Sequence, residues 1–195
     1  MASAPRCVLA AGLLLAALTP LAAPPRPTVS QEKPMPVPNA VFDTVTLNEG
    51  GPNACSPAAP PLPWEGVVIQ APTEVGFRPG RPVDGQFAAI PVCGFFQLAL
   101  ARLLDSKGLL LVAVDLKTGT RHEGLMLDED PGLPEPGLQP PPLQPEALRG
   151  MVTSAYFNPN LARYVKLPAR EATYAVHAEH GGAVSNVVKI AVVRR

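Results

Sequence analysis

The residues of this chain with the clearest chemical potential are histidines beside carboxylates. His177, Glu179 and His180 lie close together, and His122 and Glu123 form a second pair. Imidazole and carboxylate groups are ligands that zinc or copper accepts. On an extended strand, however, His177 and Glu179 share one face while His180 points elsewhere or enters a turn, which favours a solvated polar face. We therefore predict no cofactor and no metal, and keep His177, Glu179 and His180 as weak metal candidates.

A blue-copper site is not indicated either. Such a site needs a cysteine, a histidine and often a methionine on one loop, with a second histidine from elsewhere. Cys93 has no histidine near it in the sequence, and His122 and Met126 have no cysteine near them. The sequence therefore does not favour a cupredoxin, which is an exported copper-binding β-sandwich.

Catalytic groups for hydrolysis do not form a known pattern. Ser154 and Ser185 occur in strand-like sequence without a Gly-x-Ser-x-Gly turn, and Ser56 directly follows Cys55. The acidic run at residues 128–130 borders a proline-rich stretch, which is typical of a solvated loop rather than of paired glycosidase carboxylates. No glycine-rich phosphate loop occurs. The sequence therefore predicts a protein that is not an enzyme.

The amino terminus has the pattern of an export signal. Arg6 precedes an apolar run over residues 8–18, and Leu21-Ala22-Ala23 follows before a proline-rich stretch. The run is shorter than the ~20 apolar residues that span a bilayer, and no later segment supplies such a run. We predict a signal peptide over residues 1–23 and a secreted or periplasmic protein with no membrane span after signal removal. A buried N-terminal helix is the alternative.

The cysteines follow from this prediction. Removal of Cys7 with the signal leaves Cys55 and Cys93. In an oxidising compartment, two thiols in one small domain most often pair, so we predict a disulfide between them. The alternative is two buried free thiols that act as small hydrophobic side chains. A cross-link over a loop of this length stabilises a fold by ~4 kcal/mol in the chain-entropy model.

Charge and proline content set the domain plan. The chain has 16 basic and 16 acidic residues, and no basic stripe supports a nucleic-acid partner. Half of its 26 prolines gather in two blocks. The first predicts an extended tether over residues 24–39, and the second, over residues 131–145, predicts a long exposed loop within the domain. The remaining plan is a single domain over residues 40–195.

Short strands are expected through that domain. The apolar patterns predict strands over residues 41–47, 65–70 and 86–98, with the last interrupted by Pro91 and Gly94, and residues 98–104 are equally compatible with a helical turn. Residues 109–116 and 121–127 form a predicted hairpin around Lys117–Thr120. Asn158 as a cap and Pro159 at the first helical position predict one short helical turn that Pro168 ends.

The C-terminal hairpin can be predicted at the level of register. Tyr174 and Val176 lie on the more apolar face of one strand, and Val188 and Ile190 on that of the other. A two-residue Gly181-Gly182 turn would place Val176 opposite Val187 and mix these faces. A three-residue loop with Ala183 places Val176 opposite Val188 and Tyr174 opposite Ile190, so the burial pattern favours that loop. His177 and Lys189 then face water.

This last hairpin resembles the final hairpin of immunoglobulin-like and fibronectin-III-like β-sandwiches in exported bacterial proteins. The resemblance lies in residues 172–179, Gly181-Gly182 and residues 184–190. It implies a tyrosine corner, in which Tyr174 hydrogen-bonds back to the preceding loop. The cysteines do not fall on the two strands that an antibody domain bridges, and Trp64 follows Pro63 rather than lying in a central strand.

The fold expectation is therefore an all-β, immunoglobulin-like antiparallel β-sandwich with a proline-rich N-terminal tether and a long proline-rich internal loop. The functional expectation is a non-enzymatic binding or structural module of the cell envelope or extracellular space, whose partner is a protein or another envelope component. The alternative is a metal-handling or small catalytic β-protein of the envelope.

Overall fold

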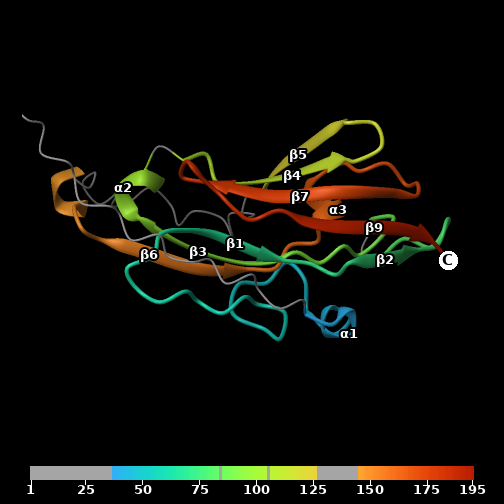
Figure 1. The fold of residues 1–195 in the computed structure, drawn as a ribbon, viewed down its shortest axis with the longest axis horizontal. Coiled ribbons are helices and arrows are strands. Elements are labelled where there is room, and N and C mark those ends of the chain that lie inside the picture. Colours follow the sequence, from blue (N-terminus) through green and yellow to red (C-terminus); the bar gives the residue numbers. More distant parts are fainter. Residues whose placement is uncertain (1–36, 84, 105, 127–144) are drawn as a thin grey trace, which may run out of the picture. The chain divides into compact units, whose positions relative to one another are not determined.

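The computed structural model describes residues 37–83, 85–104, 106–126 and 145–195. These residues form two β-sheets that pack face to face, with only short helices (Figure 1). The all-β sandwich predicted from the sequence is therefore confirmed at this level. The predicted signal peptide, nearly all of the tether and nearly all of the proline-rich loop lie outside the described residues.

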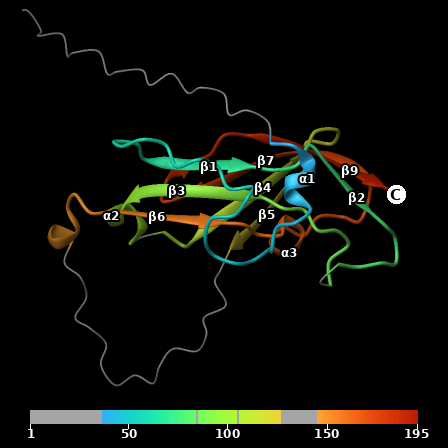
Figure 2. The same ribbon diagram turned by 90° about the horizontal axis from the view of Figure 1, so that it is seen from below.

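One sheet has three antiparallel strands in the order β1-β3-β6. Strand β1 is Gly66–Gln70, β3 is Cys93–Ala99 and β6 is Val152–Phe157. Figure 2 shows them side by side. Strand β1 matches the predicted strand over residues 65–70. Strand β3 covers only the second half of the predicted strand over residues 86–98, because the stretch before Cys93 forms isolated bridges only.

The second sheet has six strands. Its main path is β2-β9-β7-β4-β5, and β8 pairs with β7. The bounds are Glu74–Phe77 for β2, Leu109–Asp115 for β4, Arg121–Met126 for β5, Ala172–His180 for β7, Ala183–Val184 for β8 and Val188–Arg194 for β9. Strands β4 and β5 confirm the predicted hairpin. Strand β2 runs parallel to β9. Because β1 and β2 belong to different sheets, the chain crosses from one sheet to the other between them.

The core lies between the sheets. Alternate residues of the central strands are buried there, among them Ile69 of β1, Leu111 of β4, Val176 of β7 and Ile190 of β9, which have no exposed surface. Burial of such side chains stabilises a fold by about 1.5–3 kcal/mol each. The predicted core positions Tyr174, Val176 and Ile190 are confirmed, whereas Val188 is only half-buried at the margin of the core.

The described residues include four short helical segments: α1 (Asn39–Phe42), which precedes β1, and α2 (Leu100–Leu103), η1 (Pro145–Leu148) and α3 (Leu161–Tyr164), which lie between strands. The predicted strand over residues 41–47 is wrong, because α1 and a turn occupy its place. Its valines and Phe42 pack beside the cysteines instead of pairing in a sheet. Helix α2 confirms the helical alternative for residues 98–104.

Helix α3 is the predicted helical turn, but with a different cap. Asn160, and not Asn158, is the N-cap: its side chain accepts a hydrogen bond from the Ala162 N–H at 3.1 Å. The same Oδ1 accepts from the Ile90 N–H at 2.9 Å, which ties the helix to the segment before β3. The helix ends at Tyr164, before Pro168 is reached.

The terminal hairpin has the predicted register but reaches it by another route. Tyr174 pairs with Ile190 and Val176 with Val188, as predicted. The turn itself, however, is the two-residue Gly181-Gly182, both at positive φ, because His180 pairs directly with Ala183. Residues 185–187 then oppose only residues 177 and 178 of β7. This one-residue bulge shifts the register back, and the predicted three-residue loop is wrong for that reason.

Candidate functional site

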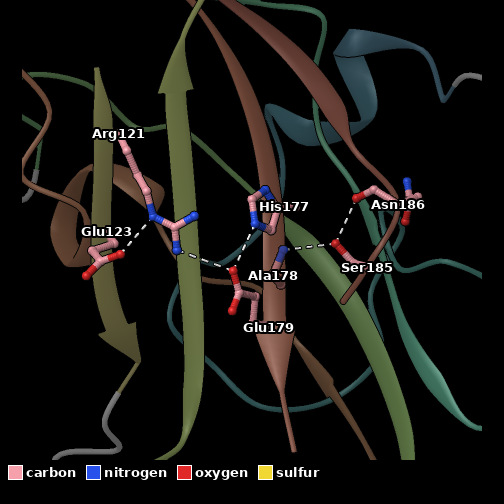
Figure 3. Close-up of polar contacts among 7 residues, drawn as sticks. All are labelled: Arg121, Glu123, His177, Ala178, Glu179, Ser185 and Asn186. Carbon is pink, nitrogen blue, oxygen red and sulfur yellow. Dashed lines mark hydrogen bonds and ion pairs between the residues drawn. The ribbon is translucent and has the colours of Figure 1, made fainter. Parts of the chain in front are cut away.

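Three of the five histidines and carboxylates singled out in the sequence, His177, Glu179 and Glu123, lie on the outward face of the six-stranded sheet. His177 and Glu179 are on β7, Arg121 and Glu123 are on β5, and β4 lies between these strands (Figure 3). Pairing sets the position of each: Val112 of β4 is opposite both Glu123 and His177. We call His177, Glu179, Arg121 and Glu123 the β5–β7 cluster.

Hydrogen bonds join the cluster across the sheet. Arg121 reaches over β4, and its Nη2 lies 3.3 Å from Glu179 Oε1, while its Nε donates to Glu123 Oε2 at 3.0 Å. His177 Nε2 lies 3.1 Å from the same Glu179 oxygen. Val112, although it faces away from the core between the sheets, has no exposed surface. The cluster therefore forms a polar layer over a buried aliphatic side chain.

The charges of the cluster stabilise one another. The hydrogen bond from His177 lowers the pKa of the Glu179 carboxyl, Arg121 adds to this lowering, and partial burial opposes it. The hydrogen bond to Glu123 raises the pKa of the Arg121 guanidinium, and Glu179 adds to this effect. Glu179 is thus an ionised acceptor shared by a histidine and an arginine.

This arrangement does not assemble the three weak metal candidates. His177 and Glu179 meet, but His180 points to the opposite face of β7. There its Nδ1 lies 3.1 Å from the Gly108 carbonyl oxygen and 3.3 Å from Ser106 Oγ, and its ring packs edge-on against Phe96. Among the described residues no group of three or more histidines, cysteines, aspartates or glutamates is placed to hold a metal ion.

The serines considered from the sequence have structural contacts. Ser185 Oγ accepts from the Ala178 N–H at 2.9 Å and donates to the Asn186 carbonyl at 2.7 Å (Figure 3), and Ser56 Oγ accepts from the Asn53 N–H at 2.9 Å. Ser154 is exposed on β6, with no histidine bonded to it. The acidic run at residues 128–130 lies outside the described residues. In the described segments, no serine is joined to a histidine and carboxylate as a hydrolase would need.

Exposed aliphatic side chains border the cluster. Val184 pairs with Glu179 and is 62% exposed, and Val187, which precedes β9, is 60% exposed. Leu116, directly after β4, is about half exposed. Aliphatic side chains beside ionised groups are suited to recognition of another macromolecule, in which the apolar groups supply buried area and the charges supply specificity.

The predicted disulfide is present. Cys55 and Cys93 are bonded, their Cα atoms are 5.8 Å apart, and neither residue has exposed surface. The bond attaches the segment before β1 to the start of β3. Phe42 is buried beside it, and half-buried valines surround it. This confirms the disulfide over the alternative of two free thiols.

Tyr174 is buried at the start of β7, with its ring edge-on to His122 at 6.2 Å. Its hydroxyl has no hydrogen-bond partner among the described residues, so the bond to the preceding loop that a tyrosine corner requires is not seen there. Burial and the nearby Asp115 carboxylate raise the pKa of Tyr174. A contact to the loop before β7 is made by Asp115 of β4, whose Oδ2 pairs with Arg170 at 2.8 Å.

His122 and Glu123 do not act as the pair that their sequence neighbourhood suggested, and Arg121 was not among the predicted site residues. Adjacent strand residues point to opposite faces, so Glu123 faces outward with Arg121 while His122 faces inward to Tyr174. The alternation of strand residues was the sequence signal that could have placed Arg121 with Glu123 and separated His122 from them. The pairing of β5 with β4 and of β4 with β7, which brings Arg121 to Glu179, is a long-range property that no local pattern encodes.

Within the described residues, no helix is long and apolar enough to cross a membrane. Compared with known proteins, the chain matches no family model, no curated protein and no solved structure.

Proposed function

We propose that this chain is an exported, non-enzymatic immunoglobulin-like module that binds a protein partner at the cell envelope or outside the cell. The observation that carries the proposal is the strand pairing. In immunoglobulin domains one sheet contains strands A, B and E, and the other contains G, F, C and, in variable-type domains, C′. The orders β1-β3-β6 and β9-β7-β4-β5 correspond to these in chain order.

Export is supported by two independent features. The sequence begins with the pattern of a signal peptide. The buried Cys55–Cys93 disulfide is the kind of bond that persists in oxidising compartments and is rare in reducing ones. Only Cys93, at the start of β3, lies on one of the two strands that an antibody domain bridges, and Cys55 precedes β1, so the proposal concerns the sandwich class and not the antibody type.

The β5–β7 cluster with its aliphatic border is the proposed binding face. Sheet faces present rigid side chains, and a rigid surface loses little conformational entropy when it binds. Arg121 and Glu179 are held by each other, and Val184 and Val187 stand exposed beside them. Such a face suits a protein surface with complementary charges around an apolar centre.

The test compares two charge reversals. Arg121→Glu places a third carboxylate beside Glu123 and Glu179, whereas Arg149→Glu makes the same change at an exposed residue outside this face. The signal-free, oxidised protein is immobilised and exposed to the secreted and surface proteins of its own organism. A partner retained by wild type and by Arg149→Glu, but bound at least ~10-fold more weakly by Arg121→Glu, is expected. Equal binding by both variants would refute this face as the site.

The metal-handling alternative has one supporting observation, the 3.1 Å contact between His177 and Glu179. Calorimetric titration with zinc or copper separates the two functions. The proposed function predicts no saturable uptake. Stoichiometric binding that His177→Ala abolishes would favour the metal-handling protein instead.

A further inference from the structure

Strand β6 is the edge of the three-stranded sheet, and its outer side has no partner among the described residues. The Leu100 N–H donates to the Met151 carbonyl at 2.8 Å, and Leu98 pairs with Thr153. Because antiparallel strands alternate, Thr153 and every second residue direct their backbone groups to β3, whereas Val152, Ser154 and Tyr156 direct theirs outward. These three residues present a row of free donors and acceptors.

The other sheet edges are protected. On β1, the Ile69 N–H donates to Asn186 Oδ1 at 2.9 Å, and Asn186 Nδ2 donates to the Ile69 carbonyl at 3.0 Å. Strand β5 carries the charged side chains of Arg121 and Glu123. Strand β2 has only four residues. Short length, side-chain caps and charged side chains are usual protections of an edge.

Within the part of the chain that the structure describes, strand β6 carries none of these protections. Its sequence, Val-Thr-Ser-Ala-Tyr-Phe, contains no charge and no proline. Val152 is 49% exposed and the adjacent Met151 is 50% exposed. An uncharged, apolar edge with free hydrogen-bonding groups favours pairing with another chain.

We propose that the edge of β6 pairs antiparallel with β6 of a second copy of this chain, with Ser154 on the two-fold axis. In this register Val152 lies opposite Tyr156 of the second copy, and Ser154 lies opposite its own equivalent. All three outward-directed residues then pair with outward-directed residues, so both rows of donors and acceptors are satisfied. The two three-stranded sheets become one continuous six-stranded sheet.

The second copy fits this edge for reasons of side-chain chemistry. Aromatic with β-branched pairs, such as Tyr156 with Val152, and pairs of hydroxyl residues stabilise antiparallel ladders. The strand carries no charge, so two copies do not repel one another. This pairing uses the three-stranded sheet, whereas the β5–β7 cluster lies on the six-stranded sheet. The proposed dimer therefore does not depend on the proposed function.

The first measurement is the oligomeric state of the oxidised, signal-free protein by sedimentation velocity. A monomer–dimer equilibrium is expected in the micromolar to millimolar range, and a monomer at every concentration would overturn the proposal. Hydrogen exchange supplies the residue-level readout. Protection of the Val152, Ser154 and Tyr156 amides should rise with protein concentration. Protection that is independent of concentration at these amides in a dimeric sample would place the interface elsewhere and overturn the proposal.

A charge-pair experiment tests the register. Ser154→Lys and Ser154→Glu each place two like charges directly opposite one another at the axis, so each variant alone should dimerise at least ~10-fold more weakly. Mixed one to one, the two variants should form a heterodimer. Thr173→Lys, at an exposed strand residue of the other sheet, is the matched control and should dimerise as wild type does. Unweakened dimers of Ser154→Lys, or no heterodimer in the mixture, would overturn the pairing.

Discussion

At the scale of single residues, the β5–β7 cluster shows how a sheet can keep charge on a surface that also buries a valine. Glu179 accepts from both His177 and Arg121, and Arg121 in turn bridges to Glu123. Each of these exposed pairs contributes little alone, typically 0.2–1 kcal/mol. Their joint effect is to exclude water from Val112 and to fix the orientation of the charges that a partner would meet.

Glu179→Gln tests the electrostatic part of this account. Because the pKa of Glu179 is lowered in the folded state, its charge stabilises the fold above the unfolded-state value of about 4.3, and this stabilisation is lost as the pH falls through the folded-state value. The side chain is 36% exposed, so the effect is screened. We expect Glu179→Gln to lower the free energy of unfolding by less than about 1 kcal/mol at pH 7.

The measurement is urea unfolding at pH 7 and at pH 3, and the difference between wild type and Glu179→Gln should be smaller at pH 3. Glu49→Gln removes an acidic group at an exposed glutamate that forms no ion pair within the described residues, and it controls for net charge. A Glu179→Gln effect that is as large at pH 3 as at pH 7 would show that packing, not charge, is the cause.

Alanine substitutions in the terminal hairpin test its faces. Val176 has no exposed surface, so Val176→Ala should cost about 2–3 kcal/mol through lost burial and the cavity that remains. Val188→Ala should cost about 1 kcal/mol, because Val188 is half-buried, and Val187→Ala should cost less than about 0.5 kcal/mol. Chemical denaturation gives all three values. A larger cost at Val187 than at Val176 would contradict the pairing.

At the scale of elements, the bulge after β8 connects the two sheets. The Ser185 side chain takes the place of a backbone acceptor for the Ala178 N–H, while Asn186 turns its amide to Ile69 in the other sheet. A carboxamide has one acceptor and two donors, so it can bond both backbone groups of one residue as a neighbouring strand would. The bulge thus protects the edge of β1 and restores the register of β9.

Asn186→Asp tests this bridge. The substitution keeps the size of the side chain but replaces the donor that faces the Ile69 carbonyl with a second acceptor. The loss of one hydrogen bond and the repulsion between two oxygens should lower the free energy of unfolding by about 1–3 kcal/mol. Asn186→Ala, which removes both bonds without repulsion, should cost less than Asn186→Asp. The reverse order in denaturant unfolding would show that the bridge is not what Asn186 contributes.

The elements also show what the sequence can reveal. The β4–β5 hairpin, the pairing of Tyr174 with Ile190 and the disulfide were predictable, because alternation, a polar turn and cysteine number are local signals. The turn length was not, because a two-residue turn followed by a bulge gives the same face pattern as a longer loop. Strand β2 has four residues, and the core-facing Thr153 and Ala155 of β6 are no more apolar than Val152 and Tyr156 on its other face, so neither strand carries a strong alternating pattern.

At the scale of the whole molecule, residues 37–65, which precede β1, form a cover over the outer side of the three-stranded sheet (Figure 1). The Cys55–Cys93 bond joins this cover to β3. The buried side chain of Asn158 also binds it: Asn158 Nδ2 donates to the Thr46 carbonyl at 2.9 Å, and its Oδ1 accepts from the Glu49 N–H at 3.0 Å. Trp64, the chain's single tryptophan, packs on Phe95 with ring centroids 6.2 Å apart. Its fluorescence therefore reports on whether the cover stays in place.

Removal of the disulfide should uncouple this cover from the sandwich. The bond closes a sequence separation of 38 residues, for which the chain-entropy model gives about 4 kcal/mol, and the Cys55→Ala, Cys93→Ala double variant should lose stability of that order. In wild type, Trp64 fluorescence and the far-ultraviolet signal of the strands should change together in urea. In the double variant, the fluorescence should change first, because the cover is then held without a covalent bond, by the hydrogen bonds of the Asn158 side chain and by the contacts of Phe42. Coincident transitions in the double variant would show that the cover and the two sheets unfold as one unit, and that the disulfide stabilises the whole domain rather than the attachment of this segment.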